Sequence, residues 1–345
     1  MKAAFIRSHG ELEQLSVGDL EIPKIKPNEV LIETKFSALN HIDLFLIKGW
    51  PSLNLNLPHI LGSDGSGIIK EIGSAVTTTK VGDRVTINPG LSCGKCYYCL
   101  SGKQNFCKQF SIMGETQWGT FSEYFKLPEH SALTIPKKFS FELAAAAPLT
   151  FLTAWRALTT QANLKRENII LIHGAGGGVS TAAIQIAKYL GAIVITTTSS
   201  ANKVKRAEKI GADYVFNYKE DPNFGKTIYN EITNKKGVDV ILDSVGKDTF
   251  QSSLRLLRPG GTLVTPGATT GAILEIDIRQ IFWKQIKVIG TTMSNQAEFR
   301  DVMNLIFQNK LNPVVDKIFP LNEVRDAEAY LKEGKQFGKV LLEIQ

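Results

Sequence analysis

The sequence lacks the features that mark membrane and secreted proteins. Among its 345 residues, no apolar run approaches the ~18 residues that a membrane-spanning helix needs. Residues 1–7 lack the apolar segment and small-residue cleavage site of a signal peptide. Hydrophobic residues make up 43% and charged residues 21%, which excludes disorder and coiled coil. We therefore expect a globular cytoplasmic protein of about two domains, at ~150 residues per domain.

Positive charge is in excess but is not concentrated. The chain has 40 Lys and Arg residues against 33 Asp and Glu residues, a net charge of +7, and no run of five or more basic residues. Such a surplus suits a phosphorylated ligand or serves solubility, whereas nucleic-acid binding calls for a basic patch. We expect a small-molecule substrate as partner, and neither nucleic acid nor a membrane.

Cysteine is absent except within one stretch of fifteen residues, which contains Cys93, Cys96, Cys99 and Cys107. Four thiolates close a tetrahedral Zn²⁺ site, and spacers of two residues let successive sulfurs face one metal. Two disulfides packed so closely would be unusual in a cytoplasmic chain. Free thiols and an iron–sulfur cluster are the alternatives. The spacing predicts one structural zinc, because a closed site has no open coordination position.

The middle of the chain alternates strand and helix signals. Strands are predicted at 169–172, 193–197, 214–216, 238–242, 262–265 and 288–292, and helices at 179–190, 202–210, 224–233, 249–257 and 279–284. Six strands with crossover helices predict a parallel, doubly wound α/β sheet.

The beginning and the end of the chain have a different pattern. Short strands at 30–36, 67–72, 84–87 and 121–125 alternate with Gly and Pro, which predicts an all-β, barrel-like or sandwich domain. The tail shows one helix at 299–308 and a final strand at 339–344, which we expect to return to the first domain. The predicted domains are therefore 1–150 with 293–345, and 151–292.

A glycine-rich turn at 174–178 separates the first strand of the middle region from its helix. Against the pattern Gly-x-Gly-x-x-Gly, the frame falls on Ala175, Gly177 and Ser180, so the match is imperfect. Backbone N–H groups at such a helix N-terminus bind a pyrophosphate. The turn therefore predicts a dinucleotide site, the alternative being a glycine-rich turn without a ligand.

The end of the second predicted strand lacks a carboxylate. A site selective for NAD has Asp or Glu there, but residues 196–203 offer only hydroxyls, small side chains, one amide and Lys203. Hydroxyls and Lys203, with Lys205 and Arg206 nearby, suit a 2′-phosphate. We predict NADP(H) as cofactor, the alternative being that these basic residues form a solvated helix face.

Several stretches together resemble the medium-chain dehydrogenase/reductase superfamily over essentially the full length. They are 40–43 (NHID), 58–67 (PHILGSDGSG), 81–85 (VGDRV), the cysteine loop, 148–155 (PLTFLTAW) and 173–180 (HGAGGGVS). The resemblance implies a GroES-like catalytic domain, a Rossmann domain of about six strands and an active-site cleft between them.

The zinc alcohol dehydrogenases of this superfamily hold a catalytic zinc at positions that fall here on Asn40, Ser63 and Leu149. An amide, a hydroxyl and an isobutyl group cannot hold Zn²⁺, and the neighbouring Asp64 is too little to restore the site. The sequence thus resembles a quinone oxidoreductase-like subgroup that retains the structural zinc lobe.

Without a catalytic metal, the expected reaction is NADPH-dependent transfer of hydride to a conjugated C=C bond or a quinone. The developing enolate needs hydrogen-bond donors, and the Asn40 amide is the predicted one. The resemblance implies that Trp50 forms an apolar wall beside the substrate. It also implies that Asp64 is the acidic residue next to the zinc-ligand position that Ser63 occupies here. Alternatives are an alcohol dehydrogenase, an enoyl-CoA or acryloyl-CoA reductase, or a nucleotide-binding protein with little turnover.

The resemblance also implies cofactor contacts and a homodimer or homotetramer. We expect His41 to contact a ribose, although an acid/base role with Asp43 is an alternative, and Thr153 to pack at the nicotinamide. Lys339 matches a segment that reaches the cofactor phosphate in relatives, the alternative being a surface lysine. The other predicted cofactor residues are Gly174, Ala175, Gly177, Gly178, Val179, Ser199, Lys203, Ser244, Val245 and Gly267.

Overall fold

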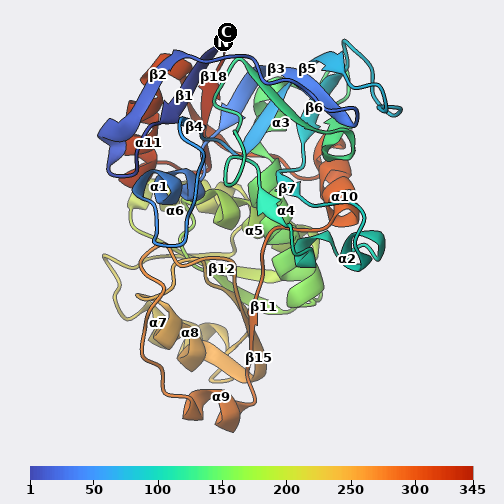
Figure 1. The fold of residues 1–345 in the computed structure, drawn as a ribbon. Helices are drawn as coiled ribbons and strands as arrows, with labels where there is room; N and C mark the ends of the chain where they lie inside the picture. The colour runs from blue at the N-terminus through green and yellow to red at the C-terminus, as the bar shows by residue number, and fades with distance from the viewer. Residues whose placement is uncertain (345) are drawn as a thin grey trace. The chain divides into compact units, whose positions relative to one another are not determined.

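The computed structural model describes residues 1–344, which divide into two compact units (Figure 1). Unit 1 comprises Met1–Leu149 and the tail from Ser294 onward, and unit 2 comprises Thr150–Met293. The chain therefore leaves unit 1 once, builds unit 2 as a single insertion and returns. Among the helices of residues 1–344, none combines the length and the apolar character needed to cross a bilayer.

Unit 1 is built mainly of strands. They are β1 (Lys2–Ile6), β2 (Leu15–Asp19), β3 (Glu29–Ala38), β4 (His59–Ile60), β5 (Asp64–Ile72), β6 (Arg84–Ile87), β7 (Gly90–Leu91), β8 (Ser111–Ile112), β9 (Tyr124–Pro128), β10 (Ala132–Thr134), β17 (Val315–Pro320) and β18 (Lys339–Glu343). Its helices are α1 (His41–Lys48), α2 (Tyr97–Leu100), α3 (Phe141–Ala146), α10 (Gln296–Phe307) and α11 (Val324–Lys332). The β-rich character predicted from the short strands is confirmed.

The largest sheet of unit 1 has seven strands in the order β10-β6-β5-β3-β18-β17, with β9 also paired to β3. β18 lies inside this sheet, antiparallel to β3 and parallel to β17. Its residues Val340, Leu341 and Leu342 are all buried, as expected for a strand with neighbours on both sides. The end of the chain is therefore an integral part of the first unit.

The tail holds more than the single helix that the sequence predicts. The predicted helix is α10, and the structure adds β17 and α11. The apolar face of α11 places Val324, Ala327 and Leu331 in the core but includes Glu328, which obscures its helical period. The strand predicted at 121–125 is also displaced, since β9 begins at Tyr124 and the buried Phe121 lies in an irregular segment before it.

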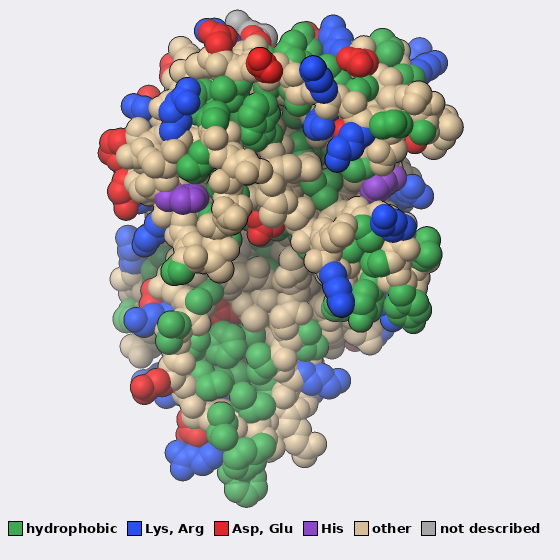
Figure 2. Space-filling model, viewed as in Figure 1, with side chains coloured by type: hydrophobic (Ala, Val, Ile, Leu, Met, Phe, Trp, Pro, Cys, Tyr) green, Lys and Arg blue, Asp and Glu red, His purple; other side chains and the backbone are tan. Residues whose placement is uncertain are grey.

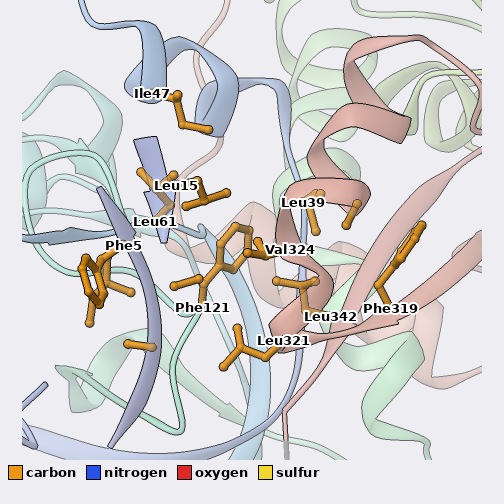
Figure 3. Close-up of a cluster of buried hydrophobic side chains, with 14 of the residues drawn as sticks. Phe5, Leu15, Leu39, Ile47, Leu61, Phe121, Phe319, Leu321, Val324 and Leu342 are labelled. Atoms are coloured by element: carbon orange, nitrogen blue, oxygen red, sulfur yellow. The ribbon is translucent and has the colours of Figure 1, made fainter. Parts of the chain in front are cut away.

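A buried apolar cluster joins the elements that surround the site described below (Figure 3). Phe5 of β1, Ile47 of α1, Phe121, Val324 of α11 and Leu342 of β18 meet in it, and none is more than 3% exposed. Burial of a side chain of this size stabilises the fold by roughly 1.5–3 kcal/mol. The cluster thereby fixes helix α1, helix α11 and strand β18 in one arrangement.

Unit 2 is a six-stranded parallel sheet in the order β13-β12-β11-β14-β15-β16. The strands are β11 (Ile169–Ile172), β12 (Ile193–Thr198), β13 (Tyr214–Asn217), β14 (Val238–Leu242), β15 (Leu257–Thr265) and β16 (Lys287–Gly290). The helices are α5 (Gly178–Tyr189), α6 (Ala201–Lys209), α7 (Phe224–Thr227), α8 (Phe250–Leu256) and α9 (Arg279–Lys284), and α4 (Pro148–Trp155) leads in from unit 1. This confirms the predicted doubly wound sheet, whose strand order reverses between β11 and β14.

Two elements of unit 2 differ from the sequence prediction. β15 begins at Leu257 and includes the Pro259-Gly260-Gly261 segment that was expected to separate a helix from a strand. Its register with β14 shifts between Val238 and Val240, so the strand accommodates this segment through an irregularity. The helix predicted at 224–233 is α7 followed by a π-helical turn at Ile228–Ile232.

Candidate functional site

Strand β3 brings together three residues of unit 1 that are far apart in the sequence. Its last residue, Ala38, pairs with Asp64 of β5 on one side and with Leu341 of β18 on the other. Asn40 lies two residues after the end of β3 and directly before α1, and Lys339 begins β18. The sheet register therefore places Asn40, Asp64 and Lys339 at one end of the same three strands.

The Lys339 ammonium lies inside this group and is only 4% exposed. It donates to Asn40 Oδ1 at 2.6 Å, to the Leu39 carbonyl oxygen at 2.7 Å and to Asp64 Oδ2 at 3.1 Å. An ammonium has three hydrogens, so all its donors have an acceptor. The surface-lysine alternative is wrong, and in this structure the charge of Lys339 is balanced by the fully buried carboxylate of Asp64.

The Asn40 amide is held on both sides. Its Nδ2 donates to Asp64 Oδ2 at 2.9 Å and to the Ala38 carbonyl oxygen at 3.2 Å, while its Oδ1 accepts from Lys339. Both amide hydrogens are therefore engaged inside unit 1. This corrects the expectation that the Asn40 amide donates to an enolate: here it positions Lys339 and Asp64.

Two further acids lie close to this group. Asp43 accepts from the backbone N–H groups of Asn40 at 2.8 Å and Gly62 at 3.1 Å. Burial nevertheless raises the pKa of Asp43 to about 7. Burial, with the nearby Asp43, also raises the pKa of Glu328 well above its ordinary range, and neither of its carboxyl oxygens has a hydrogen-bond partner within residues 1–344. Sequence analysis missed Glu328, whose signal is an acid on the apolar face of α11.

The positions expected for a catalytic zinc do not fit that metal. Leu149 contributes its backbone N–H, which donates to Asp64 Oδ1 at 2.8 Å. Ser63 is fully buried, and its hydroxyl finds no partner in the described part of the chain. Asp64 is the single carboxylate among these positions and already carries an ammonium 3.1 Å away, which repels a second cation. The site instead supplies one ion pair and one unpaired hydroxyl.

His41 and Trp50 lie on and just after α1. His41 is half-buried, and burial followed by the charge of Lys339 lowers the pKa of its imidazole. Neutral imidazole is the form that donates or accepts at a ribose hydroxyl. Trp50 is 39% exposed, so its ring presents an apolar surface on unit 1.

The four cysteines of unit 1 converge as the spacing predicts. Their sulfur atoms all lie within 4.8 Å of one another, and within residues 1–344 this is the one cluster of three or more potential metal ligands. Backbone N–H groups of Lys95 and Cys96 lower the pKa of the Cys93 thiol to about 6. Thiolates bind Zn²⁺, so the donor set and its geometry fit a closed four-sulfur zinc site.

In unit 2, the glycine-rich turn stands between β11 and α5. Gly174 has φ of +73°, a conformation that glycine adopts without strain. The first intrahelical bond of α5 runs from Thr181 N to the Gly177 carbonyl oxygen, so the N–H groups of Gly178 and Val179 have no acceptor within the helix. The turn thus offers the N–H donors that a pyrophosphate needs.

The carboxyl end of β12 carries Thr198, Ser199 and Ser200. Thr198 Oγ1 is buried without a partner inside residues 1–344, and Ser200 Oγ accepts from the backbone N–H of Lys203 at 3.4 Å as the N-cap of α6. The half-buried Ser199 and Lys203 are therefore placed at the start of α6. No carboxylate lies in this stretch.

The predicted contacts after β14 and β15 form two loops bonded to each other. The Ser244 carbonyl oxygen accepts from Thr269 N at 3.2 Å, and the Val245 carbonyl oxygen accepts from Thr270 N at 2.9 Å. Gly267 begins the second loop. Elsewhere in unit 2, Thr153 Oγ1 lies 3.8 Å from Met293 Sδ.

Comparisons with known proteins agree with this arrangement. Residues 26–137 match the model of the alcohol dehydrogenase GroES-like domain, and residues 178–308 match that of the zinc-binding dehydrogenase family. A zinc-type alcohol dehydrogenase-like protein of Schizosaccharomyces pombe is 34% identical, with 96% of each chain covered. The chain belongs to the medium-chain dehydrogenase/reductase superfamily.

Solved and curated members of the superfamily cover this chain almost completely. A crystal structure of an NAD-dependent alcohol dehydrogenase is 40% identical, with a TM-score of 0.96 and 100% of each chain covered. An acryloyl-coenzyme A reductase of Metallosphaera sedula is 30% identical over 99% of each chain. As a medium-chain dehydrogenase/reductase, the protein is an oxidoreductase with a GroES-like unit and a Rossmann unit.

Proposed function

We propose that this protein reduces a conjugated C=C bond or a quinone with hydride from NADPH and without a catalytic zinc. One observation carries the proposal: the Lys339 ammonium is held by Asn40, which occupies one of the family's metal-ligand positions, and by Asp64, which is next to a second. These residues form a closed ion pair and offer no set of metal donors. Alcohol oxidation normally uses a metal to stabilise the alkoxide, whereas a conjugated carbonyl or quinone already accepts hydride at carbon.

The unpaired hydroxyl of Ser63 takes the role first assigned to Asn40. When bound, the nicotinamide would supply a hydride, with its two electrons, for the β-carbon of the substrate, and the π electrons of the C=C bond would then move onto the carbonyl oxygen. The Ser63 hydroxyl donates to that oxygen as charge develops, which is the interaction that speeds such a step. The α-carbon then takes a proton from water, so the reaction consumes one NADPH and one proton.

The proposed cofactor domain is 151–292, with the catalytic domain formed by 1–150 and 293–345. Gly174, Ala175, Gly177, Gly178 and Val179 would hold the pyrophosphate. The loops at 244–246 and 267–271 and the side chains of His41 and Thr153 would contact the rest of the cofactor. Lys339 was expected to reach a phosphate, but its three hydrogens are all engaged within unit 1, so we assign it to the buried ion pair with Asp64 instead.

NADPH is the proposed form of the cofactor although several relatives are named NAD-dependent. The support comes from Thr198, Ser199, Ser200 and Lys203, which surround the carboxyl end of β12 with hydroxyls and one ammonium. A carboxylate there would accept from the ribose 2′-hydroxyl of NAD and repel a 2′-phosphate. The hydroxyls and Lys203 can donate to that phosphate instead.

A substrate panel tests the proposed reaction. Enones, quinones, enoyl-CoA thioesters and simple alcohols are compared side by side by following the absorbance of NADPH or of NADH. We expect reduction of a conjugated substrate to be fastest, and to persist after loosely bound metal has been removed by a chelator that leaves the cysteine site intact. The acryloyl-CoA reductase among the relatives makes a short enoyl-CoA the first thioester to test. Metal-dependent oxidation of alcohols at a higher rate would overturn the proposal.

We also infer one structural zinc, held by Cys93, Cys96, Cys99 and Cys107. When bound, the ion cross-links the loop and takes no part in the reaction, since four sulfurs leave no open position. Metal analysis is expected to find one zinc per chain. Two zinc ions, or iron, would refute this assignment.

The sheet of unit 2 offers a surface for self-association. β16 ends the strand order, so its outer edge has no partner strand within residues 1–344. Val288 on this strand and Phe282 and Trp283 of α9 are 40%, 57% and 77% exposed. Figure 2 shows hydrophobic side chains gathered over the lower part of unit 2, where Figure 1 places α8 and α9. We propose a homodimer, or a tetramer built from it, that pairs two such edges. A monomer in sedimentation experiments would refute it.

A further inference from the structure

A chain of buried polar side chains runs through unit 2 beneath the carboxyl edge of its sheet. Its members are Thr197 of β12, His173 after β11, Ser253 of α8 and Asp243 after β14. Their exposed fractions are 2%, 1%, 0% and 0%. They belong to four separate elements of the unit, and none of them has a part in the proposed chemistry. The bonds between them nevertheless connect the two segments proposed to hold the cofactor.

The hydrogen bonds of this chain have a defined direction. The Ser253 hydroxyl donates to Asp243 Oδ2 at 2.8 Å, so Ser253 Oγ is an acceptor toward His173 Nε2, 3.0 Å away. His173 Nδ1 lies 3.3 Å from Thr197 Oγ1. Gly174 N–H donates to that same oxygen at 3.3 Å, which leaves the Thr197 hydroxyl hydrogen for Nδ1. The pattern is satisfied by one tautomer, a neutral imidazole that carries its hydrogen on Nε2.

Both ends of the chain terminate on proposed cofactor loops. At one end, Thr197 holds the glycine-rich turn, accepting from Gly174 through its hydroxyl and from Ala175 through its carbonyl oxygen at 2.8 Å. At the other end, Asp243 Oδ1 accepts from Val245 N and Gly246 N, each at 3.0 Å. Thr249 Oγ1 also donates to Asp243, at 2.8 Å. A continuous set of bonds through His173 and Ser253 therefore connects the two loops.

The neutral ring agrees with its surroundings. Burial lowers the pKa of His173, while the Asp243 carboxylate acts in the opposite direction. Ser253 stands between the two groups, since its hydroxyl contacts both. The ring is thus kept from direct contact with the carboxylate that would otherwise favour its charged form.

We propose that His173 is a positioning residue for dinucleotide binding, which couples the turn at Gly174 to the loop at Val245 and Gly246 through a ring protonated at Nε2. This inference rests on the proposed function, since it assumes that these two segments bind the cofactor. Loops that are held in their bound geometry before binding lose less conformational freedom on binding. Breaking the chain at His173 should therefore weaken cofactor binding without removing any group that touches the cofactor.

The test measures NADPH affinity by fluorescence in variants of the whole chain. His173→Leu removes both ring contacts and should weaken binding about tenfold or more, and Ser253→Ala should have a similar effect. The double variant should bind about as His173→Leu does, because one break already interrupts the chain. His173→Gln keeps an N–H donor for Ser253 and should recover part of the affinity, which also provides a second variant if His173→Leu does not fold.

His59→Leu is the matched control. His59 is also 1% exposed and contacts a single backbone carbonyl oxygen, that of Gly114, at 2.8 Å in unit 1. Its loss should lower the melting temperature and leave NADPH affinity unchanged. A folded His173→Leu protein that binds NADPH as tightly as the unaltered protein would overturn this inference but not the proposed function. An unaltered protein that binds neither NADPH nor NADH would refute the proposed function as well.

Nitrogen NMR of histidine-labelled protein gives an independent readout. The chain has only 5 histidines, so the His173 signals can be assigned by their absence in His173→Gln. We expect the hydrogen on Nε2. A ring protonated on Nδ1 would reverse the direction of the bonds and overturn the proposal.

Discussion

Replacement of Lys339 by methionine tests whether the ion pair in unit 1 is buried and charged. Methionine has a similar length but removes three donated hydrogen bonds, of 2.6, 2.7 and 3.1 Å. It leaves the carboxylate of Asp64, fully buried, with Asn40 Nδ2 and Leu149 N as donors. Removing one partner of a buried pair costs about 3–5 kcal/mol, because the remaining charge is uncompensated.

For a unit of this size, a loss of 3–5 kcal/mol corresponds to a fall in melting temperature of roughly 6–20 °C. Calorimetry and urea unfolding measure it. Lys339→Met with Asp64→Asn should recover much of the loss, since an uncharged pair no longer leaves a carboxylate without its counter-ion. Lys2→Met is the control, because Lys2 and Asp19 form a pair of similar length, 2.7 Å, with side chains 57% and 70% exposed. If Lys339→Met behaves like this control, or if Asp64→Asn gives no recovery, the buried ion pair is refuted.

Four other outcomes are expected. Cys96→Ser should release zinc and lower stability more than it lowers the rate of the protein that remains folded; equal zinc content would contradict this. Lys203→Ala should weaken NADPH binding about tenfold or more, since a bond to a charged group contributes roughly 1.5–3 kcal/mol, and an equal loss for NADH would show that Lys203 does not contact the 2′-phosphate. Ser63→Ala should lower kcat by roughly 10²-fold, as loss of an oxyanion donor does, and an unchanged kcat would show that the Ser63 hydroxyl is not the donor. Asn40→Ala should lower both kcat and the stability of the fold, because it removes contacts to Lys339 and Asp64. Asp43, whose pKa is raised to about 7, binds more protons in the folded than in the unfolded protein, so its contribution to stability falls as pH rises from about 4 to 7. Asp43→Asn should flatten the plot of stability against pH in this range, and an unaltered slope would show that another group causes the fall.

The sequence was sufficient for features that depend on local order along the chain. The six parallel strands, the turn at 174–178 and the cysteine loop all consist of residues close in sequence, whose period or spacing carries the signal. Glu328 and the helix α11 that holds it were missed because an acid on an apolar face breaks the helical period. Fold and family followed from the same motifs, and the comparisons confirm both.

The site in unit 1 depends on contacts that no local pattern contains. Lys339 and Asp64 are 275 residues apart and meet because β3 pairs with both of their strands. The sequence alone determined that Asn40, Ser63 and Leu149 are poor zinc ligands, since that follows from side-chain chemistry. Only the tertiary structure decided that a lysine balances Asp64, that both amide hydrogens of Asn40 are engaged and that the Ser63 hydroxyl has no partner within residues 1–344. A hydrogen bond depends on where the folded strands bring its two atoms together.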